Sequence, residues 1–156
     1  MSRRIEGLLW ARPAQRPAGM PFGRPRGAKA QGLRYERLLA QALPSAKHGQ
    51  WFEFEDANGR GVCQTDLLLG RNGRCVVLEC KYTWTPDGHQ QLERLYLPVV
   101  QMALQRPVVG VVAAKKLVMG LPVQVASDLD EAMRIAMEGR RVVWHWTGVP
   151  VMARAA

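Results

Sequence analysis

The sequence predicts a mixed α/β domain with one sheet and helices packed against it. Residues 51–82 hold short alternating or apolar runs separated by Asn-Gly pairs, and residues 107–114 form a continuous apolar run. Helical periodicity appears before and after these segments. The length of 156 residues suits one domain with a core of ordinary size.

The first half of the chain is expected to form a helix and three strands. The helix contains good helix formers with leucines at helical spacing, and Pro44 lies beyond its end. Two Asn-Gly pairs, Asn58-Gly59 and Asn72-Gly73, are typical of two-residue hairpin turns and would join the strands. The expected ranges are helix 31–43 and strands 51–56, 62–69 and 74–82.

The second half is expected to form helix, strand, helix and strand. Pro98 has no N–H to donate, so it should disturb the second helix. The run at 107–114 is typical of a strand covered on both faces. Ser127 or Asp128 would cap the third helix and Gly139 would end it. The expected ranges are helix 87–105, strand 107–114, helix 127–139 and strand 141–146.

Composition indicates a soluble cytoplasmic protein. Hydrophobic residues make up 47% of the chain and charged residues 22%, which is typical of a globular protein. No apolar run approaches the roughly 18 residues needed to span a bilayer, and no secretory segment follows the basic start. The three cysteines lack metal-finger spacing and are interpreted as reduced, buried thiols: Cys63, Cys75 and Cys80.

The positive charge is concentrated at the N-terminus. Residues 1–30 hold seven Arg and Lys residues against one Glu, while the whole chain carries a net charge of +9. Several Pro and Gly residues and the lack of helical or strand period predict a flexible basic arm, followed by a single domain over 31–156. Such an arm either contacts phosphate backbones or is a solvated tail.

The second hairpin brings charged residues together. If Asn72-Gly73 forms a two-residue turn, Asp66 lies directly opposite Glu79. Lys81 shares the face of Glu79 because side chains alternate along a strand. Two carboxylates facing each other repel, so a plain structural role does not explain the pair.

A divalent cation between the two acids would remove this repulsion. Mg²⁺ is commonly held by one or two carboxylates, waters and substrate phosphate, and Mn²⁺ could substitute. The backbone carbonyl of Cys80 could supply a further oxygen. Lys81 would then point to the same place, able to orient a water or offset phosphate charge.

Two further acids are candidates at this site. Glu36 lies on the apolar stripe of the first helix and is expected to be a third acidic contributor, with a surface salt bridge to Arg34 or Arg37 as the alternative. Glu53 would fall beside Gln64 if the first hairpin turns at Asn58-Gly59. For Glu53, a solvent-facing strand charge is the preferred interpretation.

Glu36 on a helix, Asp66 on a later strand and Glu79-Cys80-Lys81 on its hairpin partner resemble the PD-(D/E)XK nuclease superfamily. The resemblance covers roughly residues 31–114. It implies a restriction-endonuclease-like αβββαβ core, a mixed central sheet flanked by helices, here with an extra C-terminal helix and strand. In this superfamily the acids bind metal and the lysine positions or activates the attacking water.

The segment after the motif supplies candidates for substrate contact. Gln91, with Tyr96, resembles the Gln…Tyr signature of the RecB-like branch, although the spacing differs, so Gln91 is a candidate for substrate binding and an ordinary surface amide is the preferred interpretation. Trp84 follows Lys81 closely and is expected to contact substrate. The three histidines show no metal spacing, and three cysteines are too few for the superfamily's Fe–S subgroup.

These features together predict a Mg²⁺-dependent nuclease that hydrolyses DNA in repair, recombination or mobile-element processing. One alternative is a catalytically inactive nucleic-acid-binding module on the same fold. Another is an assembly subunit in which the charged cluster is a salt-bridge network. Many relatives act as dimers or rings, so a homodimer or larger homo-oligomer is left open.

Overall fold

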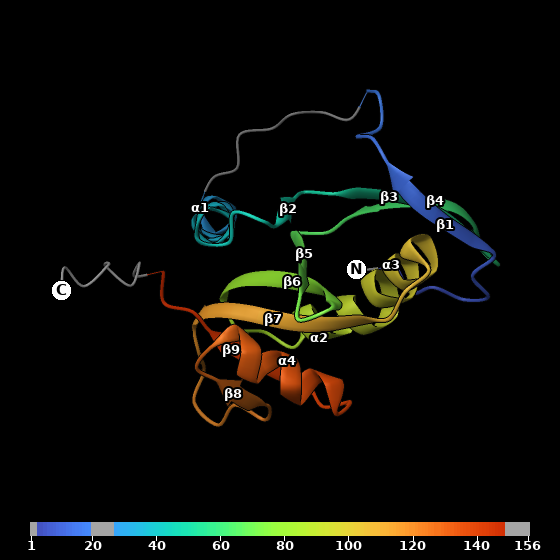
Figure 1. Cartoon of the computed structure of the whole chain (residues 1–156). Coiled ribbons are helices and arrows are strands. Elements are labelled where there is room, and N and C mark those ends of the chain that lie inside the picture. Colours follow the sequence, from blue (N-terminus) through green and yellow to red (C-terminus); the bar gives the residue numbers. More distant parts are fainter. Residues whose placement is uncertain (1–2, 20–26, 149–156) are drawn as a thin grey trace.

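A computed structural model describes residues 3–19 and 27–148 of the chain, and it shows an α/β fold with two sheets and flanking helices (Figure 1). The small antiparallel sheet has the strand order β1-β3-β4. The larger sheet is mixed, with the order β2-β5-β6-β7-β9-β8, and its last four strands are parallel. The strands are β1 (Trp10–Ala14), β2 (Lys47–His48), β3 (Trp51–Asp56), β4 (Gly59–Gln64), β5 (Leu67–Arg71), β6 (Arg74–Thr83), β7 (Val108–Lys116), β8 (Gln124–Ala126) and β9 (Val142–His145).

The prediction of a single sheet was wrong, because the expected strand 62–69 divides at Thr65. The Thr65 N–H donates to the carbonyl of Gln50 over 3.0 Å, which holds the chain against β3 as far as this residue. From Leu67 onward the chain pairs with β6 instead. One apolar run therefore supplies the edge strand β4 to the small sheet and the strand β5, between β2 and β6, to the larger sheet.

The helices occupy the predicted regions, with one irregular turn. They are α1 (Ala28–Ala42), α2 (Asp87–Gln91), η1 (Leu92–Tyr96), α3 (Leu97–Leu104) and α4 (Leu129–Met137). The carboxylate of Asp128 accepts the N–H of Glu131 and caps α4, as expected. The segment η1 is a π turn, in which the Leu97 N–H donates to the Leu92 carbonyl.

Pro98 explains a contact between this helix and the N-terminus. Without an N–H, Pro98 leaves the carbonyl of Arg94 without its helical donor. The N–H of Ile5 donates to that carbonyl over 2.8 Å. The N-terminal segment is thus attached to the helix at the point where proline interrupts the hydrogen-bond ladder.

The prediction of a flexible arm over residues 1–30 was wrong for residues 10–14. These residues form β1, which pairs with β3 along its whole length. Pro13 is tolerated there because β1 is an edge strand. Arg3 forms an ion pair with Asp56, and Arg12 forms one with Glu53. Neither guanidinium group is therefore free to bind a phosphate. Residues 1–2 and 20–26 of the expected arm lie outside the described residues.

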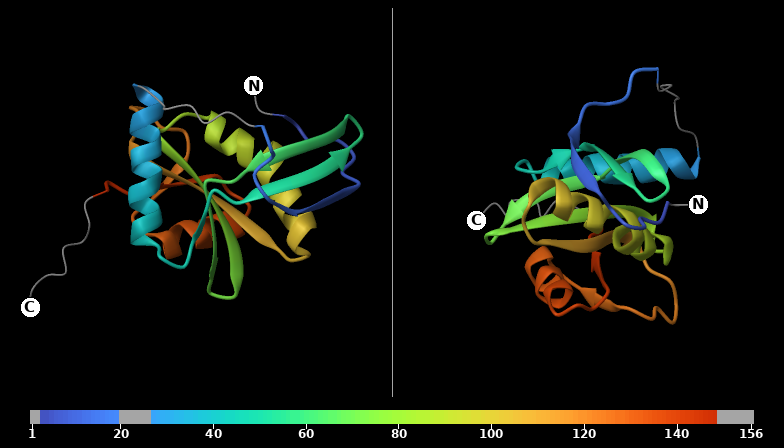
Figure 2. Two further views of the ribbon diagram at one scale, coloured as in Figure 1. Left: turned by 90° about the horizontal axis from the view of Figure 1, so that it is seen from above. Right: turned by 90° about the vertical axis from the view of Figure 1, so that its right-hand side faces the viewer.

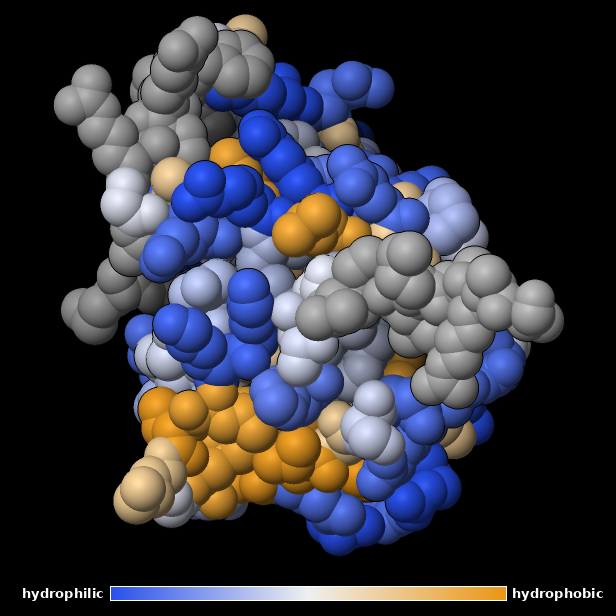
Figure 3. All heavy atoms as spheres, turned by 90° about the vertical axis from the view of Figure 1, so that its left-hand side faces the viewer, coloured by the Kyte–Doolittle hydropathy of each residue, from blue (hydrophilic) through white to orange (hydrophobic). Residues whose placement is uncertain are grey.

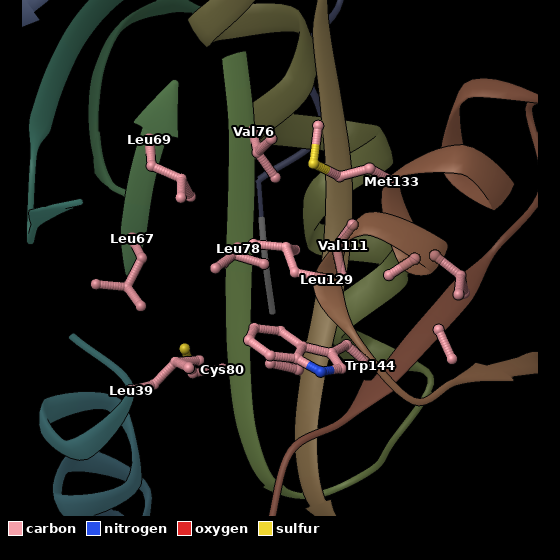
Figure 4. Close-up of a cluster of buried hydrophobic side chains, with 14 of the residues drawn as sticks. Leu39, Leu67, Leu69, Val76, Leu78, Cys80, Val111, Leu129, Met133 and Trp144 are labelled. Carbon is pink, nitrogen blue, oxygen red and sulfur yellow. The ribbon is translucent and has the colours of Figure 1, made fainter. Parts of the chain in front are cut away.

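Each face of the larger sheet has its own apolar core. One core joins the sheet to α1 and α4, and Figure 4 shows Leu39 of α1 beside Cys80 of β6 and Leu67 of β5. The other joins the sheet to η1, α3 and the small sheet. The left view of Figure 2 shows α1 standing beside one end of the sheet, opposite the β3–β4 hairpin. The first core therefore fixes α1 against β5 and β6.

The surface at the left of Figure 1 carries an apolar area, which Figure 3 shows low on that face. Exposed apolar side chains in or next to the β7–β8 connection include Val118, Met119 and Val125. None of the described helices is long and apolar enough to cross a membrane.

Candidate active site

The β5–β6 hairpin has the predicted register. Arg71 pairs with Arg74, and both turn residues, Asn72 and Gly73, have positive φ (53° and 74°). Positive φ at both central positions defines a type I′ turn, which Asn-Gly favours. The regular pairing ends with Leu67 opposite Leu78, one residue before the charged positions.

Asp66 occupies the place where the strand ladder stops. Its Oδ2 accepts the N–H of Cys80 over 2.8 Å. Within a strand, the N–H and C=O of one residue point to the same side. The carbonyl of Cys80 is therefore directed to the side where Asp66 lies, away from the ladder with β7.

Glu79 is buried on the other face of β6 from Cys80, with only 5% of its surface exposed. Its Oε1 lies 3.7 Å from the Nζ of Lys81. Its Oε2 is buried without a hydrogen-bond partner. Gly88 of α2 packs against the stem of Lys81, where an added Cβ would lie 3.4 Å from Cε. The lysine is therefore held beside the acid.

Three carboxyl groups converge here, from α1, from the bend before β5 and from β6. Glu36 of α1 contacts Asp66, and Asp66 contacts Glu79, which brings together acids more than 40 residues apart. Burial raises the pKa of Glu36, and it also raises the pKa values of Asp66 and Glu79 well above their ordinary range. Mutual repulsion adds to the burial effect, while Lys81 opposes it at Asp66 and Glu79.

Sequence reasoning missed His48 as a partner of this cluster. Strand β2 pairs with β5 and places His48 opposite Leu67, next to Asp66. The Nε2 of His48 contacts the Oε2 of Glu36. A two-residue edge strand leaves no periodicity in the sequence, so the position of His48 followed only from the fold.

Tyr96 and Gln91 also face this region. Burial raises the pKa of Tyr96, and negative charge on Glu79 and Asp66 adds to the effect. The Oε1 of Gln91 is buried without a hydrogen-bond partner. Gln91 follows Gly88 by one helical turn and so lies on the helix face that covers β6. The π turn between Gln91 and Tyr96 changes their relative direction, which the α-helical spacing in the sequence did not reveal.

The expectation that Trp84 contacts substrate is not supported. Only 6% of its surface is exposed, and its indole N–H donates to the Nε2 of His89 over 2.9 Å. A base could not stack on a ring covered in this way.

Glu53 lies in the small sheet opposite Val62, two residues from the expected register, because the first hairpin turns at Ala57-Asn58. The carboxylate of Asp56 fixes that turn by accepting the N–H of Asn58.

The three cysteines are free and buried, as predicted. Among the described residues, no three His, Cys, Asp or Glu side chains are arranged so that they could hold a metal ion. Mg²⁺ needs fewer protein ligands, since one or two carboxylates with waters commonly suffice. Asp66, the orphaned Oε2 of Glu79 and the Cys80 carbonyl are oxygen donors that fit this requirement.

Comparison with known proteins gives no family for the chain. No protein-family model and no curated protein matches it. Among solved structures, it is similar to the crystal structure of protein VC1899 from Vibrio cholerae, with 10% sequence identity and a TM-score of 0.39. The match covers 75% of this chain and 29% of that one.

Proposed function

We propose that the protein is a Mg²⁺-dependent nuclease that hydrolyses DNA phosphodiester bonds on a restriction-endonuclease-like core. The observation that carries the proposal is the buried Oε2 of Glu79, an acceptor without a donor, next to a second buried acid. An uncompensated buried carboxylate is costly, and a cation would compensate it. The sequence resemblance supports the same assignment of Glu36, Asp66, Glu79 and Lys81.

Each residue has a distinct part in this proposal. Asp66, Glu79 and the Cys80 carbonyl would hold the ion, which supplies electrostatic stabilisation of the phosphate charge. Lys81 Nζ, placed 3.7 Å from Glu79, orients the attacking water and balances charge on the substrate. Glu36 and His48 form a contact pair that can hold or pass a proton beside Asp66. Gln91 and Tyr96 lie where they can orient these groups.

The test is cleavage of supercoiled, linear and branched DNA with Mg²⁺ or Mn²⁺, and then with EDTA. We expect metal-dependent cutting that falls at least about 100-fold in Asp66→Asn and Lys81→Met. Asp130→Asn and Lys29→Met change the same charges away from the site and should retain activity. Cutting by Asp66→Asn at the wild-type rate would contradict the proposal.

A catalytically inactive nucleic-acid-binding module is the second candidate. It is favoured by the partners that already occupy two of the acids, His48 at Glu36 and the Cys80 N–H at Asp66. DNA binding without cutting, equal in wild type and Asp66→Asn, would support it.

Light scattering of the same preparations tests for a homodimer or larger homo-oligomer. The proposed substrate also implies a cytoplasmic location and a part in DNA repair, recombination or mobile-element processing.

A further inference from the structure

A small cavity opens between α1 and the ends of β6 and β7. Its volume is about 190 Å³. Side chains one helical turn apart form the α1 wall, and strand residues form the opposite wall. The lining includes Gln31, Arg34, Tyr35 and Leu38 on α1, with Tyr82 and Lys115 opposite.

The lining carries positive charge and no acid. Arg34 and Lys115 line the cavity, and within the described residues neither forms an ion pair with a carboxylate. By contrast, Arg71 and Arg141 each donate two hydrogen bonds to one acid. Cations that gather without a counter-ion are a common signature of an anion site.

Two lysine side chains lie close to the ring of Tyr82 at the cavity. The Nζ atoms of Lys115 and Lys116 lie 5.4 and 5.2 Å from the centre of its ring. Both contacts are within the range of cation–π attraction, which holds the two lysines on one aromatic surface. Two ammonium groups on one ring repel each other, and a phosphate between them would relieve this repulsion.

The cavity is built on the same two elements as the acidic cluster, α1 and β6. Arg34 precedes Glu36 by two residues on α1, and Tyr82 directly follows Lys81 on β6. Because side chains alternate along a strand, Tyr82 and Lys81 point to opposite faces of the same strand end. A chain of phosphates that passes this strand end would meet both places in succession.

Its size limits what the cavity can hold. Pockets for whole small ligands usually measure roughly 300–1,000 Å³. A cavity of about 190 Å³ therefore fits a phosphate with its sugar, and not a base pair. The phosphates of a duplex are tied to a paired strand, whereas a single strand can place one sugar and its phosphate inside.

We propose that this cavity binds the sugar and phosphate of one nucleotide of a single-stranded segment, next to the phosphodiester that is cleaved. Arg34 and Lys115 contact its phosphate, Lys116 approaches from the rim, and Tyr82 lies beneath the sugar. The inference rests on the proposed nuclease function and names its substrate class as nucleic acid with a single-stranded end or branch.

The test is binding of a fluorescent oligonucleotide in EDTA, where cleavage does not interfere. Wild type is compared with Arg34→Gln, Lys115→Gln and Arg74→Gln, the last a matched control at the far end of β6. We expect the two cavity variants to bind the single strand about tenfold more weakly, as for loss of one charge-assisted hydrogen bond. Their log–log salt slope should fall by about 0.7 per lost phosphate contact.

Two further arms separate the sources of binding. A fully paired duplex should bind all four proteins alike, and inorganic phosphate should compete better with wild type than with Lys115→Gln. Equal single-strand affinity in cavity variants and control, with matching melting temperatures, would overturn the inference. If wild type cleaves DNA but this equality is found, only the cavity assignment fails. If wild type never cleaves but the cavity variants lose binding, only the nuclease proposal fails.

Discussion

Glu79 places a carboxylate in the core of a small protein, with one oxygen near Lys81 and the other without a partner. A salt bridge alone would use both oxygens or leave the free one in water. At the scale of single residues, the charge of Glu79 is therefore a source of strain that folding tolerates. The strain is concentrated between Glu79 and Asp66, because the charge of Asp66 raises the pKa of Glu79.

Removing that charge should stabilise the metal-free protein. Glu79→Gln eliminates the repulsion with Asp66, and the new amide can donate to it. We expect a melting temperature in EDTA higher by about 2–4 °C, which corresponds to about 1 kcal/mol for a chain of this size. Adding Mg²⁺ should raise the melting temperature of wild type and leave that of the variant unchanged. Glu138→Gln, on the surface, is the control; a lower value for Glu79→Gln would indicate a plain salt-bridge network.

His89 should make stability depend on pH. Burial, with Arg141 nearby, lowers its pKa from 6.5 to about 4. The unfolded chain therefore binds a proton that the folded protein does not, and stability falls as pH drops from about 6.5 towards 4. The loss is at most about 3 kcal/mol. His89→Gln, which keeps an acceptor for the Trp84 indole, should flatten the change in denaturant midpoint over this range, and an unchanged slope would contradict the assignment.

At the scale of elements, the N-terminal segment and the second helix are connected through a proline. Pro98 frees the Arg94 carbonyl, and Ile5 takes it as an acceptor. The residues before β1 are thus joined to the helix by a backbone bond. The continuous helical segment from α2 to α3 also carries Gln91 and Tyr96, so Ile5 is coupled to the candidate site through this segment.

Pro98→Ala should weaken that connection. The new N–H at position 98 would compete for the Arg94 carbonyl, so the Ile5 amide should exchange faster with deuterium. Protection in β6 and β7 should stay the same. Pro44→Ala, beyond the end of α1, is a control without such a carbonyl. Unchanged exchange at Ile5 in Pro98→Ala would show that the N-terminal segment is held by other contacts.

The sequence predicted elements with strong local signals and missed those that depend on distant partners. Asn72-Gly73 fixed the register of β5 and β6 because its turn geometry is local. The predicted register of the first hairpin was wrong by two residues, because the carboxylate of Asp56, and not the Asn-Gly pair, sets its turn. Strand β1 contains a proline and exists only because β3 offers an edge.

In the candidate site too, residues with local signals were predicted, and contacts with distant partners were missed. Asp66, Glu79 and Lys81 followed from hairpin geometry, and Glu36 from helix periodicity and the resemblance. Trp84 appeared free for stacking because its partner His89 lies on a different element, and nothing local indicated its burial. Whether these residues bind metal and cut DNA stays a prediction, which the cleavage test addresses.

At the scale of the whole molecule, the position of α1 depends on packing. Glu36 reaches Asp66 and Glu79 only if the helix lies at the correct height on the sheet. Leu39, fully buried one turn after Glu36, packs with Leu67 and Cys80 and holds it there (Figure 4). The apolar core on this face and the geometry of the candidate site are therefore coupled.

Leu39→Ala should reveal this coupling. The cavity left behind should cost about 2–5 kcal/mol in the free energy of unfolding, measured in urea. Gln41→Ala, on the exposed side of the same helix and outside the cavity lining, should change it by about 0.5 kcal/mol or less. Because α1 would also sit less firmly, DNA cleavage by Leu39→Ala should fall at a temperature where the variant is still folded, while Gln41→Ala keeps its rate. Full cleavage by a destabilised Leu39→Ala would mean that Glu36 is positioned by its contacts with His48 and Asp66 alone.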